Sequence, residues 1–242
     1  MNTVSKNLTL PARLTGDHED ITKHITLNLD VAKTAFLLVD CDDVNTPGDP
    51  VDMVIKQTLA PTLATVRSVG MKVVFLHGGG HDDSHSIKQE RHLFRTGTRG
   101  KPRPWVPSTP KWVANVEPEY GDPVIEKNGQ SGFRETSLDF CLRTNGIETL
   151  LRVGFSFKSC LFYTMVDAAQ LNYRVIFLRD GTHPLGENEF RDTVDETLAE
   201  KGWVRLVLTR LFEDHWGYSA MCADLITGCE RLNKTVKEKG VE

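Results

Sequence analysis

Short, continuous apolar runs alternate with segments of helical periodicity along most of the chain, and this alternation is the feature that most constrains the fold. The six runs are residues 35–39, 72–76, 123–125, 149–153, 174–178 and 204–208. A strand that is apolar along its whole length is buried on both faces, as in a parallel sheet covered by helices on both sides. The sequence therefore predicts an α/β fold: a three-layer α/β/α sandwich around a six-stranded, mainly parallel, Rossmann-like sheet.

The segments between the apolar runs have the spacing of amphipathic helices. They are residues 51–68, 137–143, 159–172, 187–200 and 218–232. A chain of 242 residues fits one large domain better than two. We expect an extended N-terminal arm over residues 1–30 and a single domain over residues 31–242. Residues 78–122 are too long for a plain connection, and loops of that length are usually functional.

Composition and charge exclude several classes of partner. The formal net charge is −4 and the basic residues are scattered, so no part of the chain is built for nucleic acid or an anionic membrane. No apolar run approaches the roughly 20 residues of a membrane helix, and the first residues lack the apolar core of a secretory signal. We therefore expect a cytoplasmic protein that binds neither nucleic acid nor membranes.

The five cysteines indicate reduced thiols, because their number is odd and they lack the paired spacing of a zinc ribbon or a disulfide framework. Cys160 lies where an apolar run has ended and the helix over residues 159–172 begins. Unpaired backbone N–H groups and the positive end of the helix dipole favour a thiolate there, and the thiolate is the nucleophilic form. A buried packing role is the alternative, and position alone leaves both open.

Three chemically different side chains lie at the ends of predicted strands. Asp40 follows the run 35–39, Lys127 lies just past 123–125, and Cys160 follows 149–153. The carboxyl ends of parallel strands share one edge of the sheet, where ligands bind. Singly, these residues could be a turn cap, a solvated charge and a packing thiol. Together they form a candidate catalytic set, in which the thiol attacks, the carboxylate moves protons and the ammonium holds charge in place.

Two sequence blocks resemble those of a known enzyme family. The first is TAFLLVDCDD, residues 34–43, and the second runs from GDPVIEKNGQSGF to RVIFLRD, residues 121–180. In order and spacing they are similar to the isochorismatase-like cysteine hydrolases, which include nicotinamidases, carbamoylsarcosine amidohydrolase and the ureidoacrylate and biuret hydrolases. The resemblance covers residues 34–224, nearly the whole predicted domain.

The resemblance implies specific roles for the strand-end residues. Asp40 would be the acid and base, Lys127 its charged partner and Cys160 the nucleophile that forms a thioester. The family also has a non-proline cis peptide bond in the turn before the nucleophile, which here would join Phe155 to Ser156. The resemblance also implies an oxyanion hole made by the backbone N–H groups of Ser156 and Cys160.

The chain departs from the family at positions that border the substrate pocket. The common Met-Gln-Asn-Asp-Phe after the catalytic Asp is replaced by residues 41–45, CDDVN, and the common Thr-Asp pair before the nucleophile by residues 157–158, FK. The catalytic residues therefore carry over and the substrate does not. Candidate substrate contacts are Asn45, Trp105, Phe133 and Phe155.

One loop has the residue types of a metal site. In the nicotinamidase branch an Asp-x-His pair and a further His bind zinc, and here Asp83, His85 and His92 have ligand types that suit zinc. However, the pair lies further past the strand than that pattern requires, and the neighbouring glycine run is typical of a solvated loop. We expect no cofactor, with zinc as the alternative.

The resemblance implies a metal-independent cysteine amidohydrolase that cleaves a C–N bond of a small ureido, carbamoyl or amide substrate. The block that contains Lys127, which begins GDPVIEKNGQSGF at residue 121, most resembles the ureidoacrylate and biuret branch. The alternatives are a zinc-containing nicotinamidase-like amidase and an isochorismatase-type enol-ether hydrolase, a branch that needs no nucleophilic cysteine. As in the family, we expect a homodimer or homotetramer.

Overall fold

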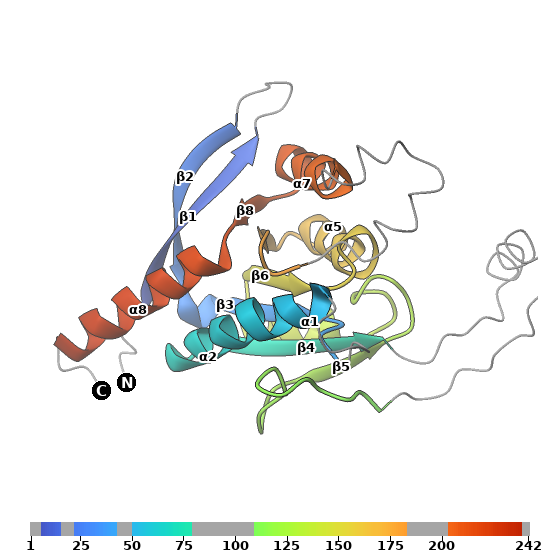
Figure 1. Ribbon diagram of the computed structural model, residues 1–242, viewed down its shortest axis with the longest axis horizontal. Coiled ribbons are helices and arrows are strands. Elements are labelled where there is room, and N and C mark those ends of the chain that lie inside the picture. The colour runs from blue at the N-terminus through green and yellow to red at the C-terminus, as the bar shows by residue number, and fades with distance from the viewer. Residues whose placement is uncertain (1–5, 16–21, 43–49, 79–108, 183–202, 239–242) are drawn as a thin grey trace, which may run out of the picture.

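The computed structural model describes residues 6–15, 22–42, 50–78, 109–182 and 203–238 (Figure 1). Eight strands form one sheet in the order β2-β1-β8-β7-β6-β3-β4-β5. They are β1 (Asn7–Thr15), β2 (Thr22–Asp30), β3 (Thr34–Val39), β4 (Lys72–Gly78), β5 (Val124–Lys127), β6 (Thr149–Gly154), β7 (Arg174–Leu178) and β8 (Tyr218–Ala220). Strands β3 to β8 pair in parallel, whereas β1 pairs antiparallel with β2 and β8. The strand order reverses between β3 and β6, the kind of position where parallel sheets bind ligands.

Helices cover both faces of the sheet. They are η1 (Val31–Lys33), the continuous run α1 (Pro50–Val54), η2 (Ile55–Leu59) and α2 (Ala60–Ser68), then α4 (Leu138–Thr144), η3 (Phe157–Leu161) with α5 (Phe162–Gln170), α7 (Trp203–His215) and α8 (Cys222–Glu238). The α2 and α8 helices pack on one face, and α4, α5 and α7 on the other. The predicted three-layer α/β/α sandwich is confirmed. None of the described helices is both long and apolar enough to span a membrane.

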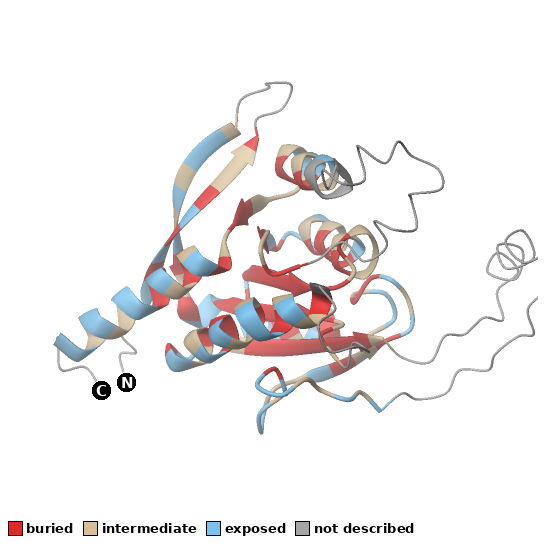
Figure 2. Ribbon diagram, in the orientation of Figure 1, coloured by how far each residue is buried: buried red, intermediate tan, exposed pale blue. Residues whose placement is uncertain are grey.

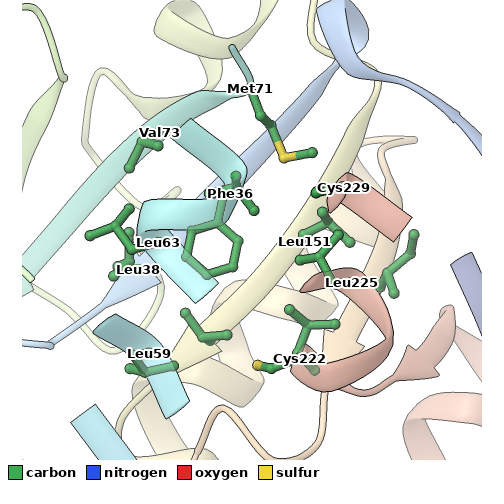
Figure 3. Close-up of a cluster of buried hydrophobic side chains, with 14 of the residues drawn as sticks. Phe36, Leu38, Leu59, Leu63, Met71, Val73, Leu151, Cys222, Leu225 and Cys229 are labelled. Carbon is green, nitrogen blue, oxygen red and sulfur yellow. The ribbon is translucent and has the colours of Figure 1, made fainter. Parts of the chain in front are cut away.

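Strand β3 shows why the sheet has two cores. All six of its residues are buried (Figure 2), and successive side chains point to opposite faces. Phe36 and Leu38 pack with Leu63 and Leu225 from α2 and α8 (Figure 3), while Leu37 belongs to the core under α4, α5 and α7. The continuous apolar run in the sequence is thus the consequence of burial on both sides.

The prediction of a strand at residues 204–208 is wrong, because these residues lie in α7. The longer segment explains the error: apolar residues recur at 204, 207, 208, 211 and 212, which is helical spacing. The sixth parallel strand is instead β8, which the sequence placed at the start of the last helix. The predicted helix over residues 187–200 lies outside the described residues.

Residues 1–30, predicted as an extended arm, contain β1 and β2, which bring the sheet to eight strands. Among the described strands, the β1–β8 ladder that joins the hairpin to the parallel part has one residue pair, Arg13 opposite Ser219. Leu8, Leu10 and Ala12 alternate with exposed residues along β1 and are buried in the core beside α8. One face of β1 is therefore apolar and the other open to solvent, as in an antiparallel strand at the rim of a core.

Candidate active site

Asp40, Lys127 and Cys160 meet at the carboxyl ends of the parallel strands. The Lys127 Nζ atom lies 2.9 Å from Asp40 Oδ2 and donates a hydrogen bond to Cys160 Sγ at 3.3 Å. Asp40 follows β3, Lys127 ends β5, and Cys160 lies in η3 just after β6. The order of the strands thus brings together three residues that are far apart in the chain.

Strand β4 lies between β3 and β5, so the lysine side chain has to cross its end. Gly78 occupies that position and stands directly opposite Lys127 in the β4–β5 register. A Cβ atom at Gly78 would already lie 3.7 Å from Asp40 Oδ1 and 3.9 Å from Lys127 Nζ. Because this is van der Waals contact, a longer side chain would enter the space that the ion pair occupies.

The Asp40–Lys127 pair is largely shielded from water. The Lys127 side chain is 3 % exposed and that of Asp40 is 21 % exposed. Asp40 has a φ of +49°, a left-handed conformation that aspartate tolerates better than most residues. Its second oxygen, Oδ1, is buried and has no hydrogen-bond partner among the described residues. That oxygen therefore has acceptor capacity left for a thiol or a substrate.

The surroundings raise the pKa of both the Lys127 ammonium and the Cys160 thiol. Burial acts to lower the pKa of Lys127, but the charges and hydrogen bonds of Asp40 and Cys160 outweigh it and raise that pKa. For Cys160, burial raises the pKa of the thiol, Asp40 raises it further, and Lys127 only partly opposes them. The net direction is opposite to the lowered pKa expected from the helix start, because burial and Asp40 raise the pKa of this thiol.

A tight turn carries the chain from β6 into the cysteine helix. Gly154 has a φ of +120°, and a Cβ atom there would overlap the Val39 carbonyl oxygen. The Phe155 N–H donates to that same oxygen at 2.8 Å. The peptide bond between Phe155 and Ser156 is cis, as the resemblance implied. Ser156 caps η3, and its carbonyl accepts from the N–H of Leu161 at 3.2 Å.

Of the residues predicted to contact substrate or bind metal, two lie in the described part of the chain, Phe155 and Phe133. Phe155 is 1 % exposed and packs in the core on the α2 side, so the structure places it beneath the site instead of on a pocket surface. The Phe133 ring packs against Tyr173, with centroids 5.8 Å apart, and under the guanidinium of the fully buried Arg152. Five predicted residues lie outside the described part of the chain: Asn45, Asp83, His85, His92 and Trp105. Within the described part, no group of three His, Cys, Asp or Glu side chains could hold a metal ion.

Asp42 lies close enough to the ion pair for the charges of Asp40 and Lys127 to act on its carboxyl group. Asp42 forms an isolated β-bridge with Trp112, whose ring lies 6.2 Å from that of His77. Burial raises the pKa of Asp42, and the nearby charge of Asp40 adds to the effect, although the Asp42 backbone, His77 and Lys127 oppose it. A second carboxylate thus lies beside the first; its only sequence signal is its place two residues after Asp40.

An open hollow of about 380 Å³ lies elsewhere, around the first residues of β4. Three of its charged lining residues pair with one another: Arg67 lies 2.5 Å from Asp122 and 3.1 Å from Glu119. Strand β4 separates this hollow from the ion pair, which lies at the other end of the strand. The described lining of the hollow does not combine a cysteine with a neighbouring base, so the edge with Asp40, Lys127 and Cys160 is the stronger candidate active site.

Comparisons with known proteins identify the family of the chain. Two ureidoacrylate amidohydrolases named RutB are 29 % identical to the chain: that of Rhizobium rhizogenes over 84 % of the chain and 88 % of its own length, and that of Agrobacterium fabrum over 83 % and 93 %. A cysteine hydrolase from Pseudomonas syringae pv. phaseolicola has the same fold, with a TM-score of 0.64, 20 % identity and coverage of 84 % and 95 %. An N-carbamoylsarcosine amidase from Thermoplasma acidophilum has a TM-score of 0.50 and 27 % identity, with coverage of 66 % and 92 %. Residues 34–204 match the profile of the isochorismatase domain, and the chain therefore belongs to the isochorismatase family.

Proposed function

We propose that this protein is a cysteine amidohydrolase that cleaves a C–N bond of a small ureido, carbamoyl or amide substrate through a thioester on Cys160. The observation that carries the proposal is the Lys127 ammonium, which contacts both the Asp40 carboxylate at 2.9 Å and the Cys160 sulfur at 3.3 Å. A nucleophile, a base and a fixed positive charge are the parts that acyl transfer needs. The ureidoacrylate and carbamoylsarcosine enzymes among the relatives support the substrate class.

The first step forms the C–S bond. Asp40 accepts the thiol proton as the sulfur of Cys160 adds to the substrate carbonyl carbon, because the raised pKa of the thiol leaves little thiolate beforehand. Lys127 stays protonated and stabilises the negative charge as it moves from the carboxylate to the sulfur. The carbonyl oxygen becomes the oxyanion of a tetrahedral intermediate.

The second step breaks the C–N bond. The backbone N–H groups of Ser156 and Cys160 donate to the oxyanion, a contribution of about 3–4 kcal/mol per donor in comparable sites. Asp40 returns its proton to the departing nitrogen, so ammonia or an amine leaves and a thioester remains. Water then attacks the thioester and gives a proton to Asp40. The C–S bond breaks, and the released thiolate of Cys160 takes that proton from Asp40 as the acid product leaves. These three side chains supply the nucleophile, the proton transfers and the charge, so we propose that the reaction needs no metal.

The proposal is tested by ammonia release from biuret, an N-carbamoyl amino acid, a ureidoacrylate, a maleamate-like amide and nicotinamide. We expect turnover of a ureido or carbamoyl compound that survives a chelator and falls at least about 10³-fold in Cys160→Ser, because the serine hydroxyl is a far weaker nucleophile in a site built for a thiol. Cys141→Ser is the matched control, since Cys141 is a free cysteine on α4. Mass spectrometry should detect the acyl group on the Cys160 peptide.

Two results would contradict the proposal. Full activity in Cys160→Ser would show that this thiol is not the nucleophile. Turnover of nicotinamide that the chelator abolishes and zinc restores would support the zinc-containing branch instead.

A further inference from the structure

Thr164 joins the nucleophile helix to the loop that follows Lys127. It lies on α5, one helical turn after Cys160, and is fully buried. Its hydroxyl donates to the Cys160 carbonyl at 2.6 Å and accepts from the Gly132 N–H at 2.9 Å. A hydroxyl has a single proton to donate and lone pairs to accept, so these two contacts fix its orientation.

The first of these contacts is ordinary and the second is not. A threonine inside a helix commonly bonds to the carbonyl four residues earlier. Gly132, however, is 32 residues away in sequence, five positions after Lys127 in the segment that leads to α4. The Thr164 hydroxyl is therefore a tie between two of the three elements that build the site.

The packing around Gly132 shows that this approach is close. A Cβ atom there would overlap the Leu76 side chain and lie 3.3 Å from Thr164 Cγ2 and 3.4 Å from Leu138 Cδ2. The backbone can come this near to Thr164 because glycine has no side chain. The loop is also closed on itself, since the Thr136 hydroxyl donates to the Gly132 carbonyl.

The hydrogen bond between Thr164 and Gly132 affects the position of Lys127 relative to Cys160. Strand β5 is the outer strand of the described sheet and pairs with β4 over four residues. The ion pair with Asp40 holds the end of the lysine side chain, and the contact of Gly132 with Thr164 connects the loop after Lys127 directly to the Cys160 helix. We propose that Thr164 is a positioning residue that holds the Lys127 segment in register with the backbone of Cys160 and so sets the Lys127–Cys160 distance. This inference rests on the proposed function, in which these two residues act together.

The test compares Thr164→Val, which keeps the shape and removes the hydroxyl, with Thr164→Ser, which keeps the hydroxyl. In the valine variant we expect kcat to fall about 10- to 100-fold with KM changed less than about 3-fold, because small misplacements of catalytic groups cost that much. The midpoint pH for alkylation of Cys160 by iodoacetamide should rise, because Lys127 favours the thiolate and would stand further away. The serine variant should restore both.

Thr62→Val is the matched control. Thr62 is also fully buried on the opposite face of the sheet, and its hydroxyl donates to the carbonyl four residues earlier at 2.6 Å. Its loss should lower stability and leave kcat and the alkylation midpoint unchanged. If Thr164→Val behaves in the same way, Thr164 has only a structural role and the inference is overturned.

Two further measurements keep the test decisive. Should the valine variant fail to fold, amide exchange in the wild-type protein decides: the Gly132 N–H must be strongly protected, and exchange at the rate of an exposed loop would refute the tie. Alkylation needs no substrate, so if none of the test compounds is hydrolysed, the proposed function fails while the tie is still judged on its own.

Discussion

At the scale of single residues, Asp40 and Lys127 act in opposite directions on one thiol. Burial raises the pKa of Cys160, the Asp40 carboxylate adds to this effect, and the Lys127 ammonium opposes it. The same carboxylate that makes the thiolate costly is, in the proposed mechanism, the base that takes its proton. In the proposed mechanism, the resting enzyme is thus protected from adventitious alkylation and becomes nucleophilic only when proton transfer and attack occur together.

Asp40→Asn should therefore separate thiol acidity from turnover. Removing the carboxylate removes a contribution that raises the pKa of Cys160, so the midpoint of iodoacetamide alkylation should move to lower pH. Turnover should fall about 10²- to 10⁴-fold, because the base is lost. Lys127→Met should have the opposite effect on the midpoint of alkylation. The ammonium group that favours the thiolate is lost, so the midpoint should move to higher pH. A midpoint that rises in Asp40→Asn would contradict this account of the site's electrostatics.

At the scale of single elements, the exit from β6 depends on one glycine. Gly154 combines a φ of +120° with a backbone so close to β3 that a Cβ atom would overlap the Val39 carbonyl oxygen. The turn between the sheet and the cysteine helix can form only if this carbonyl is free to accept the Phe155 N–H.

We predict that Gly154→Ala lowers the free energy of unfolding by more than about 3 kcal/mol, through backbone strain and steric overlap together. Urea denaturation measures this change. Gly146→Ala is the control, because Gly146 also has a positive φ, +68°, but its Cβ atom would meet nothing within 4 Å. It should cost only the roughly 1–2 kcal/mol of the left-handed conformation. Equal losses in the two variants would mean that the contact with Val39 does not matter.

The sequence predicted the parallel core and the residues at its edge, but not the smaller elements. Five of the six predicted strands are present because a run buried on both faces is apolar throughout. Strand β8 has three residues, too few to show any periodicity. The alternation along β1 was a usable signal, because Leu8 and Leu10 face the core while their neighbours are exposed.

The candidate site was predictable for the same reason and to the same extent. Asp40, Lys127 and Cys160 follow predicted strands, and the ends of parallel strands share an edge. The direction of a side chain within a turn has no such rule, so Phe155 was expected at the pocket and lies in the core. Contacts across the chain, such as that of Thr164 with Gly132, also leave no periodic pattern in the sequence.

At the scale of the whole molecule, one buried carboxylate fastens the N-terminal hairpin to the rest. Glu213 on α7 has a side chain that is 1 % exposed, and Arg13 of β1 donates to it at 2.5 Å. The Ser219 hydroxyl of β8 donates to the same carboxylate oxygen. This group thus links β1, β8 and α7, beside the one residue pair that joins β1 to β8.

Glu213→Gln should loosen this junction while preserving its shape. We expect a loss of about 1–3 kcal/mol in the free energy of unfolding, because a buried charge-assisted bond becomes a weaker one and Arg13 loses its counter-charge. Urea denaturation measures the loss, and faster proteolysis in the hairpin would locate it. Glu148→Gln is the control, since the Lys33–Glu148 pair is exposed and should contribute nothing measurable. An unchanged Glu213→Gln would show that the apolar contacts of β1 alone hold the hairpin.

The placement of Lys127 on β5 also affects how the enzyme would fail on heating. Asp40 and Cys160 follow central strands that are paired on both sides, whereas β5 has a partner on one side only among the described strands. Outer strands open in local, sub-global fluctuations that need less free energy than global unfolding. The ammonium group would therefore leave the site while the central strands are still intact. If Lys127 acts as we propose, thermal inactivation should begin below the melting temperature, as a reversible loss of the ammonium group from the site and not as denaturation.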